Sequence, residues 1–194
     1  MRRVGLLVFL MAMASVVFTG LASAQTSHFN NNSRGAFGVW DGTASYGALP
    51  YLYTQVNASQ SARDGKSVHV SQTAYDFPVT RSVQIEGGGS TKAGDDVSLR
   101  IARDLSGAHV SGSDLPATRC VYVDQVETGC TDITIDVDVT WTGQGAIERY
   151  VQGGLGIHTN YLRRDAVASG SAAGQALPLS EFSYGGLFVS NFGF

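Results

Sequence analysis

Apolar and polar residues alternate along most of this chain with a period of two. The clearest segment is 131–142, whose apolar positions are Ile133, Ile135, Val137, Val139 and Trp141. The positions between them are polar: Asp132, Thr134, Asp136, Asp138 and Thr140. Such alternation is typical of a β-strand with one face in the core and one in water. A register slip of one residue would bury three carboxylates, so we expect the pairing of this strand to be firmly fixed.

The same period recurs in short segments that are separated by turn-forming pairs such as Asp64-Gly65 and Gly94-Asp95. The predicted strands are 35–40, 52–61, 67–75, 80–86, 97–104, 118–125, 131–142, 164–172 and 186–192. The pattern predicts a single antiparallel β-sandwich of about seven to nine strands. A small up-and-down β-barrel is the alternative. Trp141 and Trp40 are expected in the core, together with the apolar positions of 131–142 and Val97, Leu99, Ile101, Val121 and Val123.

The first 24 residues carry the pattern of a secretory signal peptide. Arg2 and Arg3 precede an uncharged apolar run over 4–21, and Ala22-Ser23-Ala24 forms a cleavage site. We therefore expect a secreted or cell-surface protein, with a flexible polar segment over 25–34 and one β domain over 35–194. The mature chain keeps 11 basic residues (13 minus Arg2 and Arg3) against 16 acidic ones, a net charge of −5. This balance disfavours nucleic acid and anionic membranes as partners.

Cys120 and Cys130 are the two cysteines of the chain. In an exported protein an isolated pair predicts one disulfide.

The segments 138–145 (DVTWTGQG) and 163–174 (RRDAVASGSAAG) resemble the C-terminal half of uncharacterised secreted bacterial all-β proteins. The resemblance implies an exported all-β protein and brings no assigned activity.

Paired carboxylates on the outward face of 131–142 are the first candidate site. Residues two apart on a strand lie about 6.5–7 Å apart on one face. Asp136 and Asp138 therefore form a candidate calcium site, and the same spacing overlaps that of inverting glycosidase carboxylates. The simpler interpretation is that these residues only solvate the outer face.

Histidines are scattered at His28, His69, His109 and His158, with no pair at metal-ligand spacing. A secreted hydrolase assembled from His69 or His109 and a serine is an alternative function, although no G-x-S-x-G motif is present. We predict no catalytic residues.

Two further groups are candidate ligand-binding residues. Tyr51 and Tyr53 share a predicted face with amides, which suits an extracellular glycan. The segment 142–160 is expected to be a loop that carries Glu148, Arg149, Tyr150 and His158. The leading functional prediction is an exported, non-catalytic protein that binds a glycan or a protein.

Aromatic residues also gather near the C-terminus, at Phe182, Tyr184, Phe188, Phe192 and Phe194. This pattern is typical of the closing strand of outer-membrane barrels, so an outer-membrane location is the further alternative.

Overall fold

The computed structural model describes residues 31–154, 157–177 and 182–193. The predicted signal peptide lies outside them. The described residues form ten strands: β1 (Asn31–Tyr46), β2 (Leu49–Ser61), β3 (Gly65–Tyr75), β4 (Arg81–Ser90), β5 (Val97–Ile101), β6 (Gly107–Val123), β7 (Val126–Gly154), β8 (Ile157–Ala172), β9 (Gln175–Leu177) and β10 (Phe182–Gly193). Nowhere in these ranges is there a helix with the length and apolar character needed to cross a membrane.

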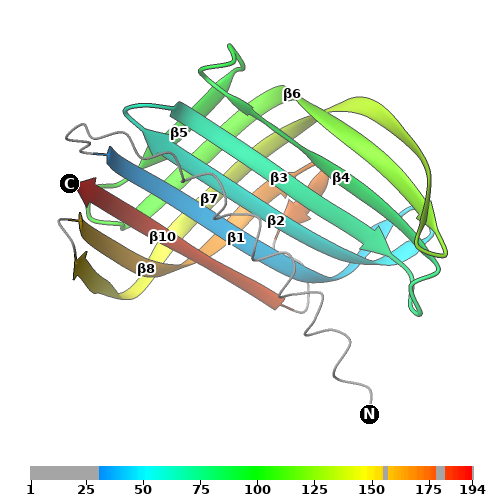
Figure 1. The fold of residues 1–194 in the computed structure, drawn as a ribbon. Coiled ribbons are helices and arrows are strands. Elements are labelled where there is room, and N and C mark those ends of the chain that lie inside the picture. The colour runs from blue at the N-terminus through cyan, green and yellow to red at the C-terminus, as the bar shows by residue number, and fades with distance from the viewer. Residues whose placement is uncertain (1–30, 155–156, 178–181, 194) are drawn as a thin grey trace.

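All ten strands belong to one antiparallel sheet whose pairing closes on itself. The order runs β10-β1-β2-β3-β4-β6-β7-β8, and β8 pairs with β10 again. In Figure 1, β10, β1, β2, β3 and β4 lie side by side, and β6 and β7 pass behind them. The remaining strands are short: β5 pairs with β6, and β9 pairs with β8. The predicted antiparallel all-β class is confirmed.

The core lies between the inward faces of this closed sheet. Every second residue of β7 from Ile135 to Trp141 is buried, as the alternation predicts. Facing strands contribute further buried side chains: Leu52, Val56, Val70, Leu99, Val110, Leu115 and Leu187. Three predicted core residues, Ile101, Val121 and Ile133, are partly buried and pack against this cluster. Val123 is instead 41% exposed, because it precedes the turn at the end of β6.

Two buried tryptophans form hydrogen bonds between β1 and the strands on the other side of β10, which are β8 and β7. The indole Nε1 of Trp40 donates a hydrogen bond to the carbonyl of Ala168 in β8 (3.4 Å). Conversely, Nε1 of Trp141 in β7 donates a hydrogen bond back to β1, to the carbonyl of Phe37 (2.8 Å). Both side chains are 1% exposed. Trp141 is thus the core anchor that the sequence predicted, with its polar atom satisfied.

The prediction of a loop over 142–160 is wrong. β7 continues to Gly154 and β8 starts at Ile157, so the segment is a β-hairpin. A register shift separates Gln144 from Glu148, and regular pairing resumes with Glu148 opposite Arg163. The glycines of this segment are typical of a loop, but its two arms pair with each other and residues 158–160 of β8 also pair with β10. Pairing to a strand distant in sequence therefore overrides the local composition.

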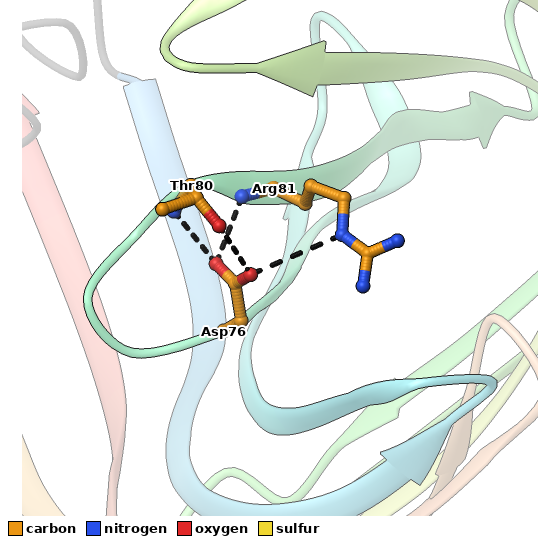
Figure 2. Close-up of polar contacts among 3 residues, drawn as sticks. All are labelled: Asp76, Thr80 and Arg81. Carbon is orange, nitrogen blue, oxygen red and sulfur yellow. Dashed lines mark hydrogen bonds and ion pairs between the residues drawn. The ribbon is translucent and has the colours of Figure 1, made fainter.

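One carboxylate organises the turn between β3 and β4. Asp76 accepts hydrogen bonds from the backbone N–H groups of Thr80 (2.7 Å) and Arg81 (2.8 Å) and from the Thr80 hydroxyl (2.6 Å), as Figure 2 shows. The Arg81 guanidinium lies 3.9 Å away. These donors, the Arg81 N–H first among them, lower the pKa of Asp76 to about 2.

The predicted disulfide is present. Cys120 and Cys130 lie directly opposite each other in β6 and β7, and their sulfurs are bonded at 2.00 Å. A structural disulfide is typical of proteins in an oxidising environment outside the cytoplasm.

Candidate binding surface

The outward face of the sheet is mostly polar, but aromatic side chains gather on it in one region. The region covers neighbouring parts of β7, β8, β10 and β1. We call it the aromatic surface and define it by Tyr150, Tyr161, Phe188, Tyr184 and Phe37, together with Arg163. Tyr150 and Tyr184 are its most exposed rings, at 53% and 40%.

The aromatic rings contact one another across strands. The ring centroids of Tyr150 and Tyr161 are 6.1 Å apart, and those of Tyr161 and Phe188 are 6.0 Å apart. Beside this row, Phe37 and Tyr184 lie 5.5 Å apart at an angle of 58°. These distances fall within the range of favourable aromatic pairs. The result is a row of three rings over β7, β8 and β10, with a second pair beside it.

Glycines on the paired strands make room for two of the rings. Phe188 lies opposite Gly35, and Phe37 lies opposite Gly186. A Cβ atom at Gly35 would lie 2.1 Å from the Phe188 ring, and one at Gly186 would lie 2.7 Å from the Phe37 ring. Each phenylalanine therefore covers the strand position that its partner glycine leaves empty. This reciprocal arrangement keeps both rings close against the sheet.

Arg163 places a positive charge within the aromatic surface. Its guanidinium carbon lies 5.6 Å from the centroid of the Tyr184 ring, within cation–π range. Its Nη2 donates to a carboxylate oxygen of Asp165 (3.0 Å). The side chain is 31% exposed, and its buried Nε has no hydrogen-bond partner among the described residues. A cation is thus held beside one aromatic ring and one carboxylate.

Two phenols of this surface, Tyr150 and Tyr161, stay neutral at physiological pH. Tyr150 donates its hydroxyl proton to Glu148 Oε2 (2.8 Å), and this hydrogen bond raises the tyrosine pKa above its usual value. Burial raises the pKa of Tyr161. Both hydroxyls therefore keep their protons, and the surface combines apolar ring area with polar groups at its margin.

The four ligand-binding residues predicted in 142–160 separate in the structure. Glu148 and Tyr150 belong to this region, because alternate residues of β7 share its outward face. Arg149 points to the opposite face, where its Nη2 donates to Asn160 Oδ1 (3.2 Å). The backbone of His158 pairs with Gly153 and Gly193, but its side chain is outside the described part of the structure.

Tyr51 and Tyr53 form a separate, smaller aromatic group on β2. The Tyr51 ring stacks on that of Tyr75 in β3, with centroids 5.5 Å apart. The Tyr53 hydroxyl donates to Gln55 Oε1 (3.4 Å). Burial, followed by the charge of Asp41, raises the Tyr53 pKa. These contacts are those of cross-strand packing, and no ring contact links this group to the aromatic surface within the described ranges.

The two aspartates proposed for calcium already have protein partners. Asp136 Oδ1 accepts the backbone N–H of Asp114 (3.0 Å), and Asp138 Oδ1 lies 3.0 Å from His109 Nε2. They border a shallow depression of about 280 Å³ lined by Asp96, Ser111, Gly112, Ser113, Asp136, Val137 and Asp138. Among the described His, Cys, Asp and Glu side chains, three ligand atoms come within 4.8 Å of one another only at Cys120, Glu127 and Cys130, and there the two sulfurs are bonded to each other.

Sequence reasoning did not find Tyr161, Arg163 or Phe37 as members of a site. The available signal was alternation on both sides of Gly153-Gly154, which places Tyr150 and Tyr161 on one face of a hairpin. Phe188 was noted only as part of the C-terminal aromatic group. Bringing it next to Tyr161 requires the pairing of β8 with β10, which no local pattern gives. Of that group, the side chains of Phe182 and Phe192, and all of Phe194, lie outside the described residues.

Comparison with known proteins finds no family model, no curated protein and no solved structure that matches this chain.

Proposed function

We propose that this protein is an exported, non-catalytic binding protein that holds a glycan on its aromatic surface. The observation that carries the proposal is the row of Tyr150, Tyr161 and Phe188 on an otherwise polar face. Sugar rings have apolar C–H faces and a rim of hydroxyls, so they are complementary to aromatic rings bordered by hydrogen-bonding groups. On this surface, the hydrogen-bonding groups that border the rings are the Tyr150–Glu148 pair and Arg163.

The surrounding outward face supports a location in water after export. Along the middle of β7 the outward residues are carboxylates and threonines, and along β2 they include Gln55 and Asn57. An outer-membrane location requires an apolar outward band, which these residues do not supply. The disulfide supports export as well.

A secreted hydrolase is the second candidate, and one observation favours it. His109 is paired with Asp138 at 3.0 Å, and Ser111 lies directly opposite Asp138 beside the shallow depression. A triad also needs a serine hydroxyl bonded to the second nitrogen of the histidine. The described contacts of His109 include no such serine, so we rank binding first.

The test is retention of the exported chain by a panel of soluble and insoluble polysaccharides. Tyr184→Ala and Tyr150→Ala should each weaken binding about 10-fold or more, because loss of an aromatic anchor typically costs about 2 kcal/mol. Tyr122→Ala removes an outward tyrosine of β6 and is the matched control. The proposal fails if no polysaccharide is retained, or if the Tyr150 and Tyr184 variants bind as tightly as the wild type. Loss of binding in Tyr51→Ala alone would move the site to β2.

A further inference from the structure

The end of β7 has a free backbone edge. β6 starts at Gly107, opposite Thr142, and the last backbone hydrogen bond on that side joins the N–H of Gly143 to the carbonyl of Ser106 (2.9 Å). From Glu148 to Gly154, β7 pairs in unbroken register with β8. Within the described residues, no strand pairs with the other edge of this segment. Its N–H and C=O groups on that edge are spaced to accept another strand.

This edge carries two charged side chains, Glu148 and Arg149, but lacks other features that usually protect exposed strands. Segment 147–154 (IERYVQGG) contains no proline and no lysine. Its apolar side chains are open to solvent: Ile147 is 44% exposed and Val151 is 64% exposed. The register shift that blunts β7 lies before Glu148, so the segment after it remains regular. The edge therefore fits an added β-strand.

We propose that this edge of β7 pairs antiparallel with the same edge of a second copy of this chain, around a two-fold axis at Tyr150. Such an axis, perpendicular to the sheet, keeps the outward faces of both copies on one side. It sets Tyr150 opposite Tyr150 of the second copy and Arg149 opposite Val151 of the second copy. Moving the axis to Arg149 would oppose two arginines, which is unfavourable. Moving it to Val151 would lose the pairing of the two tyrosines.

This register joins the aromatic surfaces of the two copies. Within each copy the row runs from Phe188 through Tyr161 to Tyr150, which is the ring nearest the free edge. Across the axis the two Tyr150 side chains become a cross-strand pair, so one row continues into the other. A polymeric glycan would then span two sites and gain avidity. This last step rests on the proposed function, whereas the strand pairing does not.

The test is sedimentation velocity of the exported chain from micromolar to millimolar concentration. A pairing of so few residues buries less than the roughly 1,200 Å² of a stable interface, so we expect a weak, concentration-dependent dimer. Val151→Lys should give a monomer, because the lysine faces Arg149 of the second copy. Val167→Lys, at a position of β8 that is 55% exposed, is the matched control and should dimerise as the wild type does. Adding Arg149→Glu to Val151→Lys should restore the dimer through opposite charges.

The outcomes separate this proposal from glycan binding. A wild-type chain that stays monomeric overturns it and leaves an extended peptide as the occupant of the edge. A dimer that persists unchanged in Val151→Lys also overturns it. An intact, Val151→Lys-sensitive dimer that retains no polysaccharide supports the pairing and contradicts only the glycan. A monomeric Val151→Lys variant should bind short oligosaccharides as the wild type does, but lose affinity for the polymer.

Discussion

The outward face along the middle of β7 and the aromatic surface belong to the same sheet but are built differently. Along 132–140, carboxylates and threonines alternate with buried side chains, and their contacts are local pairs such as His109–Asp138. At the aromatic surface, outward side chains contact one another across four strands. The first face is what any strand between core and water requires. The second exceeds that requirement, which is why we propose it as the binding surface.

The two faces also differ in the residues of the neighbouring strand that lie beneath the outward side chains. Within the described residues, the side-chain hydrogen bonds of Asp132, Asp136 and Asp138 involve no glycine, whereas the Phe188 and Phe37 rings each lie over one. Glycine weakens a strand, so its presence opposite each ring has a cost that the covering ring offsets. The comparison predicts that substitutions at these glycines are severe and that substitutions on the carboxylate face are mild.

The largest effect is expected for Gly35→Val. A valine side chain cannot share space with the Phe188 ring, 2.1 Å from the new Cβ, so the ring must leave the sheet. We expect a loss of about 1–3 kcal/mol in the free energy of unfolding, measured by urea denaturation, together with loss of glycan binding. Gly129→Val on β7 is the control, because nothing lies within 4 Å of its Cβ. Equal stability of the two variants would refute the supporting role of Gly35.

A smaller, pH-dependent effect is expected for Asp76→Asn, which tests a carboxylate that does organise structure. The folded-state pKa of Asp76 is about 2, below its usual value of 3.8. Its stabilising contribution is therefore complete above pH ~4 and is lost as the pH falls through about 2. The variant should melt at a lower temperature than the wild type at pH 7, and the difference should disappear near pH 2. A difference that stays constant with pH would exclude the ionised carboxylate as its cause.

The smallest effect is expected for Asp138→Asn. Its pair with His109 is solvent-exposed, with 67% of the Asp138 side chain accessible, and such pairs contribute about 0–1 kcal/mol. Thermal unfolding should shift little, and the glycan affinity should not change. Repeating the measurement with calcium in place of a chelator tests the metal prediction. A rise in melting temperature with calcium that disappears in Asp138→Asn would support the predicted calcium site. It would then weaken the contrast between a face that only contacts water and a face that binds a ligand.

The residues of β7 illustrate how far the sequence predicts this fold. The alternation from Ile135 to Trp141 correctly predicts a strand and its buried face, because alternation is a local property of the sequence. The continuation of that strand to Gly154 was missed, since Gly153 and Gly154 locally resemble a loop and are held in the sheet by β8, which is itself paired with β10. Half of β6 was missed for the same reason, because its residues from Gly107 to Gly112 are fixed by β5 and β7.

The candidate site depends even more on distant pairing. Tyr150 and Glu148 could be singled out because charged and aromatic residues are dense there. That Tyr161 would lie between Tyr150 and Phe188 follows from two registers, β7 with β8 and β8 with β10. Gly35 gave no sign of its role, because its importance lies in a ring that comes from the far end of the chain.

Pairing between β1 and β10 has a consequence for the order of folding. Asn31 lies opposite Phe192, so the sheet closes by pairing β1, the first described strand, with β10, the last described strand. Until β10 arrives, β1 and β8 each present an open edge, and contacts this distant in sequence form slowly. A chain in which β10 has not yet paired therefore keeps both edges open, and open strand edges favour aggregation.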